Sequence, residues 1–502
     1  MIIDDTVSDL TISSSLANGH YQLNSLTIAS GVTINLLSAS PRLGFNSFLN
    51  NAGLIQIISG GRTLAQDASG SVGYFINSGT IQAVGTGAQL NISATVNNAG
   101  GLLRAGNGGA LNFNGSRLIT GGDLHIEAGS SFKYENVQSL TGQPFTLSSV
   151  NFNNEGHLNW SYANVNRHKN LVIDGGVFTN SGTVSYIVSG SNGEANPYYD
   201  YDLKLNGEAT VTNSGVMLFR NTGMENTART SFSYDEYVSL TVSLTGTGSF
   251  TNSGYIEIYN NTIGVTSGAS GTKTQYTALT VNDGEKFTNT GTVSVSLGAD
   301  TLDDAQHYAM LKVNTNWTNH GTVLIDGADK TLAEARLDLT GQTYTAAAGS
   351  LTELAGGGQI IANAVNLSGT IAGMGEILAA TTVSAGGVLA PSGTLTLTGD
   401  LTVSGGTLEF DGAANSFLYI DGDVDFTGGI LSVSNIDLTS GNYLLADYTG
   451  SLLGQTLTIS GVSDAVLDFA TGGKIYLAIP EPSVWALLLT GGALLAVLRR
   501  RR

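Results

Sequence analysis

The stretch Phe178-Thr179-Asn180-Ser181-Gly182-Thr183-Val184 contains the pattern that decides the fold. An apolar or aromatic residue is followed two positions later by asparagine, then by glycine and then by an aliphatic residue, with one residue of any kind between each. The pattern occurs nine times with all four positions filled, and its asparagines are Asn51, Asn77, Asn98, Asn154, Asn180, Asn213, Asn252, Asn289 and Asn319. Such self-similarity predicts an array of similar structural units.

The spacing of these asparagines indicates the size of one unit. Asn51 and Asn77 are 26 residues apart, and Asn77 and Asn98 are 21 apart. A β-helical coil of three short strands needs about 20–30 residues. The gap of 56 residues from Asn98 to Asn154 is therefore expected to hold about two coils, and other long gaps to hold insertions. A propeller would give more regular repeats of about 40–45 residues, and separate β-sandwiches would not explain the recurring corner.

Each position of the pattern has an expected role in such a coil. The two apolar residues end one strand and begin the next, and both point inward. Asparagine and glycine occupy the corner, where we expect a positive φ, which these two residues tolerate best. Equivalent asparagines are expected to stack from coil to coil and to form a hydrogen-bonded ladder.

The composition agrees with an ordered all-β chain. Among the 502 residues there are 67 glycines but only 6 prolines, and 41% of the residues are hydrophobic. Cysteine is absent, which excludes disulfides, thiolate metal sites and cysteine nucleophiles. The net charge of −19 argues against binding to nucleic acid, and it is compatible with neutral glycans.

The pattern changes after about Gly341, so we divide the body into regions 1–345 and 346–478. The second region alternates apolar and polar residues between glycine turns. Its phrases Gly386-Gly387-Val388-Leu389-Ala390-Pro391 and Leu418-Tyr419-Ile420-Asp421-Gly422-Asp423-Val424 resemble the distal passenger region of autotransporters. The similarity covers roughly residues 366–440 and implies a β-helical surface protein. We predict that residues 1–478 form one elongated right-handed parallel β-helix, or β-solenoid.

The C-terminal tail, residues 479–502, has a different character. Val484 to Leu498 contain no charged residue, and Arg499, Arg500, Arg501 and Arg502 follow at once. With Pro482 and Ser483 the apolar run reaches the lower limit for a single transmembrane helix, and the arginines would remain cytoplasmic. A buried C-terminal helix is the alternative.

Pro480, Glu481 and Pro482 precede the apolar run. The order of Pro-Glu-Pro, short hydrophobic span and arginine cluster resembles the PEP-CTERM sorting signal of Gram-negative bacteria. The resemblance covers residues 479–502. It implies recognition by an exosortase, a membrane transpeptidase, and a link to exopolysaccharide and biofilm. The start Met1-Ile2-Ile3-Asp4-Asp5 departs from the signal peptide expected in that family.

Few residues suggest chemistry. The histidines lie far apart, and no catalytic motif is found in the sequence, so we predict neither enzymatic activity nor a cofactor. Asp421, Asp423 and Asp425 would share one side of a strand, which offers a Ca²⁺ site as the alternative to a solvated face. Tyr198, Tyr199 and Tyr201 are expected in an insertion, where they either stack on sugars or pack against the coil.

Two functions follow from this sequence. The first is an exported structural or adhesive protein, anchored transiently in the inner membrane with its body in the periplasm and then placed at the cell surface or in the matrix. The alternative is a β-helix polysaccharide lyase or glycoside hydrolase. A carboxylate cluster on one sheet face would favour the enzyme, and a side covered by serine, threonine and asparagine would favour the structural protein.

Overall fold

The computed structural model describes residues 2–3, 9–12, 20–36, 42–66, 74–114, 118–135, 144–159, 167–189, 199–222, 236–261, 275–301, 307–436, 442–462, 465–469 and 472–478. The described residues form strands, turns and two short 3-10 helices, and they contain no α-helix. None of them belongs to a helix that could cross a membrane. The predicted transmembrane segment, residues 482–498, lies outside the described residues, as do the Pro-Glu-Pro motif and the arginine cluster.

The chain divides into two compact units. Unit 1 comprises residues 1–342 and 356–358, and unit 2 comprises residues 343–355 and 359–502. The predicted boundary between residues 345 and 346 lies close to this division. Each unit is built from parallel strands that pair coil upon coil, so the all-β solenoid-type architecture predicted from the repeat is present.

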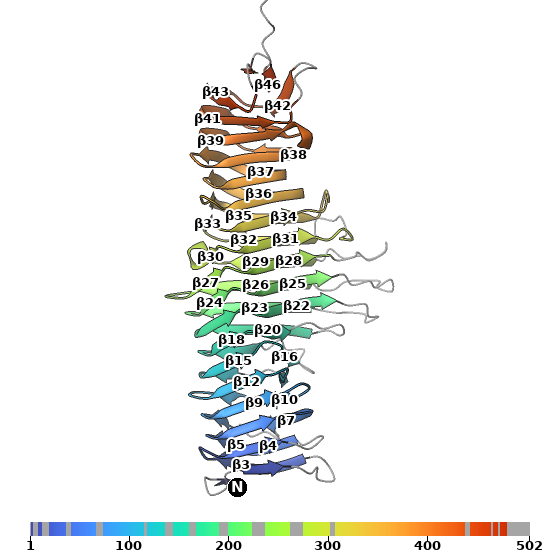
Figure 1. Cartoon of the computed structure of the whole chain (residues 1–502), viewed down its shortest axis with the longest axis vertical. Coiled ribbons are helices and arrows are strands. Elements are labelled where there is room, and N and C mark those ends of the chain that lie inside the picture. The colour runs from blue at the N-terminus through green and yellow to red at the C-terminus, as the bar shows by residue number, and fades with distance from the viewer. Residues whose placement is uncertain are drawn as a thin grey trace, which may run out of the picture. The chain divides into compact units, whose positions relative to one another are not determined.

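Unit 1 has three parallel faces, and successive strands visit them in turn (Figure 1). The first face is an eleven-stranded sheet. Its strands are β2 (Asp9–Ile12), β4 (Thr33–Leu36), β6 (Leu54–Ile57), β9 (Thr80–Val84), β12 (Leu102–Gly106), β15 (Asp123–Ile126), β18 (Asn151–Asn154), β21 (Val177–Asn180), β24 (Thr210–Asn213), β27 (Ser249–Asn252) and β30 (Phe287–Asn289).

The second and third faces are also parallel ladders. The second contains β7 (Gly61–Gln66), β10 (Gln89–Ser93), β13 (Ala110–Asn114), β16 (Ser131–Glu135), β19 (His157–Asn159), β22 (Thr183–Ser189), β25 (Val216–Thr222), β28 (Tyr255–Asn260), β31 (Thr292–Leu297) and β34 (Thr322–Asp326). The third contains β8 (Tyr74–Asn77), β11 (Val96–Asn97), β14 (Leu118–Thr120), β17 (Phe145–Ser148), β20 (Arg167–Asp174), β23 (Tyr199–Gly207), β26 (Glu236–Leu244), β29 (Gln275–Val281), β32 (His307–Val313) and β35 (Glu334–Ala346).

The remaining elements of unit 1 sit at its ends and corners. The strands β3 (His20–Ile28) and β5 (Arg42–Asn51) pair with each other and run along both the second and third faces. β1 (Ile2–Ile3) pairs with β3. The 3-10 helix η1 (Gly284–Lys286) precedes β30, and β33 (Trp317–Asn319) precedes β34.

The core of unit 1 consists of columns of inward side chains. Residues alternate between buried and exposed along each strand, as a strand with one solvated side requires. In one column of the first face, Phe152 stacks on Phe178 at 4.9 Å between ring centroids, and farther along the same column Phe250 contacts Phe287 at 5.1 Å. The repeat phenylalanines are therefore core residues, as predicted.

All nine repeat asparagines are 0% exposed, and they form hydrogen-bonded ladders. The Nδ2 of Asn154 donates to Oδ1 of Asn180 at 2.7 Å, and Asn180 donates to Asn213 at the same distance. The predicted ladder is confirmed, but it is two ladders instead of one. Asn51, Asn77 and Asn98 lie where the third face meets the first, whereas Asn154, Asn180, Asn213, Asn252, Asn289 and Asn319 lie where the first meets the second.

The reason expected for the repeat glycine was wrong. Gly215 and Gly254 do not have a positive φ. A Cβ on Gly215 would lie 2.2 Å from the carbonyl oxygen of Gly182 in the preceding coil, and Gly254 has the same relation to Gly215. Glycine is required because neighbouring backbones approach too closely for any side chain. Gly100 is the exception, with a φ of +76° and open space around it.

Unit 2 has shorter coils and different corners. Thr370 pairs with Val388, and Val388 pairs with Thr407, so one coil is completed in fewer residues than in unit 1. Its strands are β36 (Leu351–Leu367), β37 (Thr370–Ser384), β38 (Val388–Thr398), β39 (Leu401–Asp411), β40 (Phe417–Asp421), β41 (Val424–Ser434), β42 (Tyr443–Tyr448), β43 (Leu452–Gln455), β44 (Thr458–Ser460), β45 (Val466–Asp468) and β46 (Lys474–Ala478), with the 3-10 helix η2 (Gly412–Ala414).

The last described strand of unit 2 runs in the opposite direction to its neighbours. β46 runs antiparallel to both β42 and β45. Such pairing covers the edge of the parallel stack, which would otherwise present unpaired backbone groups to other chains.

Candidate functional site

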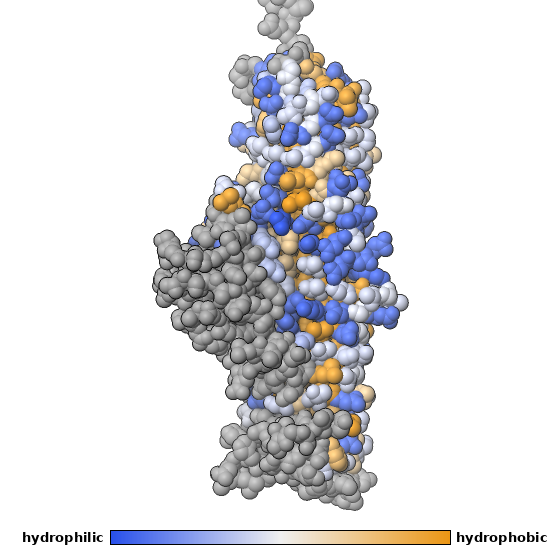
Figure 2. Space-filling view, turned by 180° about the vertical axis from the view of Figure 1, so that it is seen from behind, coloured by the Kyte–Doolittle hydropathy of each residue, from blue (hydrophilic) through white to orange (hydrophobic). Residues whose placement is uncertain are grey.

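Polar residues are spread over the side of the chain that Figure 2 draws. Figure 2 shows hydrophilic residues across one side, with hydrophobic residues in small separate patches. Among the described residues, the exposed large hydrophobic side chains include Val177, on the first face, and Ile430, in unit 2. Single apolar residues of this kind are normal on protein surfaces and do not mark a binding site. We therefore look for the candidate site among the polar groups.

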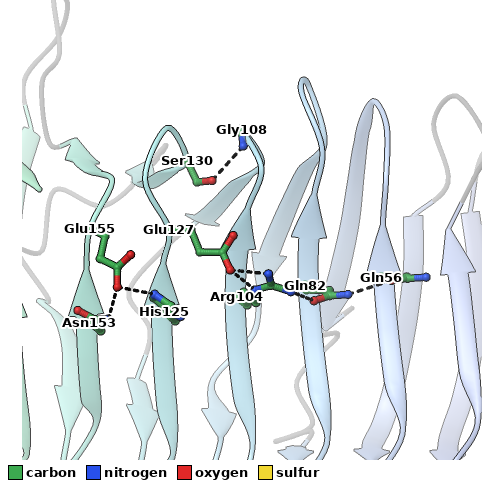
Figure 3. A network of polar contacts seen from close by, with 9 residues as sticks. All are labelled: Gln56, Gln82, Arg104, Gly108, His125, Glu127, Ser130, Asn153 and Glu155. Carbon is green, nitrogen blue, oxygen red and sulfur yellow. Dashed lines mark hydrogen bonds and ion pairs between the residues drawn. The ribbon is translucent and has the colours of Figure 1, made fainter.

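A row of polar side chains crosses five successive strands of the first face (Figure 3). Gln56 (β6), Gln82 (β9), Arg104 (β12), His125 (β15) and Asn153 (β18) occupy one register column. They point outward because the neighbouring residues in each strand fill the core. The parallel register therefore aligns side chains that are far apart in the sequence.

Most of this row is hydrogen-bonded within itself. Gln82 donates through Nε2 to Oε1 of Gln56 at 2.9 Å, and Arg104 donates through Nη1 to Oε1 of Gln82 at 2.9 Å. Arg104 also donates through Nε to Oε1 of Glu127 at 2.7 Å. The guanidinium thus joins an amide row to a carboxylate, and both side chains are partly exposed.

A second carboxylate lies at the other end of the row. Oε1 of Glu155 is 3.3 Å from Nε2 of His125 and accepts a hydrogen bond from Nδ2 of Asn153 at 2.9 Å. In the adjacent outward column, Asn151 donates through Nδ2 to Oδ1 of Asp123 at 3.1 Å. Each of these carboxylates is engaged by a neighbouring side chain.

An open hollow of about 260 Å³ lies over β12, β15, β18 and β21. Its polar lining comes from Asp123, His125, Asn151, Asn153 and Thr179. Leu102 and Val177 supply apolar groups on the first and last of these strands. Pockets that bind small organic groups combine apolar walls with a few polar side chains in this way, although this hollow is small.

The second face contains a serine–histidine pair. Nε2 of His157 (β19) lies 2.9 Å from Oγ of Ser185 (β22). Burial lowers the pKa of His157, and the charge of Lys133 lowers it further. Ser185 is only 3% exposed, so a substrate would not reach its hydroxyl. We therefore assign this pair to packing and not to catalysis.

The three candidate calcium ligands are distributed over two strands. Asp421 ends β40, Asp423 lies in the turn, and Asp425 follows the start of β41. Asp421 accepts a hydrogen bond from Thr449 at 2.7 Å, and Asp423 accepts one from the backbone N–H of Ser451 at 2.6 Å. The described residues contain no group of three side chains arranged to hold a metal ion. The assumption that these aspartates share one strand was wrong, because the corner falls between them.

The tyrosines expected in an insertion belong partly to a strand. Tyr199 and Tyr201 are in β23, and Tyr201 is fully buried, whereas Tyr198 lies outside the described residues. Tyr201 is a core residue and is not available for stacking on a sugar.

Neither the polar row nor the hollow was predicted from the sequence. One signal was available: the residue between the apolar position and asparagine is threonine in Phe178-Thr179-Asn180, Val211-Thr212-Asn213, Phe250-Thr251-Asn252, Phe287-Thr288-Asn289 and Trp317-Thr318-Asn319. A recurring polar residue at an outward position indicates a surface column.

Comparison with known proteins adds no assignment. The chain matches no protein family, no curated protein and no solved structure.

Proposed function

We propose that this chain is an exported bacterial protein of the cell surface or extracellular matrix, with a structural or adhesive role, and that its first face contacts glycan. The observation that carries the glycan contact is the open hollow on the first face, whose lining presents amide, hydroxyl and carboxylate groups beside apolar residues. Such a lining matches the alternating hydroxyl groups and C–H surfaces of sugars.

Sorting through the tail is the second part of the proposal. Pro480, Glu481 and Pro482 would be read by an exosortase-type transpeptidase, residues 482–498 would form a transmembrane helix, and Arg499 to Arg502 would hold its cytoplasmic end. The body would face the periplasm before its release to the surface. Its β-helix would be right-handed, as parallel crossover connections favour. The sequence of residues 479–502 supports this part of the proposal.

The sorting proposal is tested in the native host with one epitope tag in the body and another after Arg502. We expect the body tag at the surface or in the medium without the C-terminal tag, and we expect Glu481→Ala to block their separation. A Glu353→Ala variant, which changes a carboxylate in β36, serves as the control. If both tags stay together in the membrane in every variant, the tail is an anchor only. A body tag that remains in the cytoplasm overturns the export proposal.

The hydrogen bonds of the carboxylates favour binding over catalysis. Asp123 accepts from Asn151, Glu127 pairs with Arg104, and Glu155 lies against His125 and Asn153. A general acid or nucleophile must reach its substrate, and these groups are occupied by structural partners. No nucleic acid is expected as a ligand, because the chain carries a net charge of −19.

A glycan-cleaving enzyme is the second candidate, and one observation favours it. Asp123 and Glu155 contribute carboxylates near the hollow, and paired carboxylates carry glycoside hydrolysis. Incubating the full chain with purified exopolysaccharide and measuring new reducing ends decides between the two. The binding proposal predicts no release. A release that Glu155→Gln abolishes would establish the enzyme.

A further inference from the structure

Threonines continue the outward column of the first face beyond the hollow. Thr179 in β21 is in register with Thr212 in β24, which pairs with Thr251 in β27, which pairs with Thr288 in β30. The first three are partly exposed and Thr288 is exposed. One residue type thus occupies the same site in four successive coils.

These hydroxyl groups differ from the amides at the other end of the column. Gln56, Gln82 and Arg104 are bonded to one another. Within the described part of the chain, no hydrogen bond reaches the side-chain hydroxyl of Thr179, Thr212 or Thr251. The hydroxyl groups of the threonines can therefore donate and accept hydrogen bonds with a ligand. Most polar groups of Gln56, Gln82 and Arg104 are already hydrogen-bonded within the protein.

The column is regular and stiff. Paired strands lie about 4.8 Å apart, so the hydroxyl groups recur at that interval along the direction in which the coils stack. Threonine is β-branched and restricted at χ1, which keeps each hydroxyl and methyl in a defined position. Only a ligand with its own repeat of similar length can contact several such groups at once, and an extended glycan has one such unit per sugar.

The hollow and the column are continuous. Thr179 belongs to both, and Val177, which is 42% exposed, adds an apolar surface beside it. Thr210 and Ser249 extend the second outward column of the same sheet with further small hydroxyl side chains. A chain seated in the hollow would next meet the hydroxyl-bearing side chains of β24 and β27.

The charges of the site select against anionic glycans. Among the described residues of the site, Glu127 pairs with Arg104 and Glu155 with His125, whereas Asp123 accepts a hydrogen bond from the neutral Asn151. The chain as a whole has a net charge of −19. A uronate-rich polymer would be repelled by the carboxylates of the site and by the net negative charge of the chain, whereas a neutral glycan would not be.

We infer that the ligand of the first face is a linear neutral glycan that lies along the stacking direction of unit 1, from the hollow over Thr212 and Thr251 to Thr288. This inference rests on the proposed glycan contact and specifies it. Binding is then distributed along the column, so that affinity depends on the length of the glycan.

The test uses the full chain and neutral β-1,4-linked glucose oligosaccharides, from the disaccharide to the octasaccharide, with affinities measured by calorimetry. We expect affinity to rise about tenfold between the shortest and longest members that bind, because each added sugar reaches further hydroxyl groups. The double variant Thr212→Val, Thr251→Val keeps the shape of the face and removes two hydroxyls. It should lose most of that rise and retain the affinity for short oligosaccharides.

The matched control is Thr292→Val, Thr322→Val, which changes two registered threonines on the second face. It should behave as the unmodified chain does. Affinity that is independent of length, with binding retained, overturns the inference and leaves the proposed glycan contact intact. If no oligosaccharide of any length binds, the glycan contact itself fails. Tighter binding of a polygalacturonate than of the neutral series overturns the charge argument.

Discussion

The two asparagine ladders of unit 1 solve the same problem at different corners. The shorter ladder, Asn51 to Asn98, joins the third face to the first, and the longer ladder, Asn154 to Asn319, joins the first to the second. Both run in one direction, with Nδ2 of each coil donating to Oδ1 of the next. The two ladders differ in which corner of the coil holds the buried asparagine side chains.

The corner without asparagine uses a different chemistry. After the shorter ladder ends, the third face meets the first through Gly121 and Gly122, and in the following coils through Ser149 and then Gly175, all with positive φ. A tight turn can thus be made by left-handed backbone or by an asparagine beside a glycine that a neighbouring coil approaches closely. The repeat motif therefore marks a type of corner and not a fixed place in the coil.

Breaking the middle of the longer ladder should have the largest effect. Asn213→Ala leaves the donor of Asn180 and the acceptor of Asn252 without their amide partner inside the core. Two buried groups deprived of a partner cost about 2–4 kcal/mol of unfolding free energy. Urea unfolding followed by circular dichroism should show a clear decrease in the midpoint.

Removing the first amide of the same ladder should cost less. Within the part of the chain that the structure describes, Oδ1 of Asn154 has no hydrogen-bond partner, because the residue in register with it on the preceding strand is Ile126. Asn154→Ala removes one donor from Asn180 and at the same time removes this unsatisfied acceptor, so we expect a loss of about 1 kcal/mol. Equal shifts of the urea midpoint for Asn154→Ala and Asn213→Ala would contradict a ladder in which interior and end positions differ.

The smallest expected effect is the pH dependence of stability that His157 causes. Because burial and Lys133 lower the pKa of His157 in the folded chain, the unfolded chain takes up this proton first. Stability should therefore fall as pH drops from about 7 through 6.5 towards the folded pKa. His157→Gln should flatten this part of the profile, while the region above pH 7 stays unchanged. An identical profile in the variant would mean that other groups cause the pH dependence.

The inward half of each strand could be predicted from the sequence, and the outward half could not. Phe178 and Asn180 are fixed by the core and the ladder, so their pattern recurs and reveals the coil. Asp123, His125 and Asn151 share no such constraint, and they meet because of the parallel register. The shift of the asparagine ladder to another corner after Asn98 could not be predicted either, because the motif has the same residue types at both corners. The tail, residues 479–502, remains a prediction from its sequence.

The connection between the second and third faces absorbs almost all variation in coil length. From Asn154 onward, the first face always passes to the second through two residues, such as 181–182 or 214–215, whereas β22 and β23 are separated by residues 190–198 and β25 and β26 by residues 223–235. Doubling the length of such a connection costs only about 0.6 kcal/mol of closure entropy. The repeat can therefore accept new peptide segments here during evolution, or by design, while the ladders and the core keep their register.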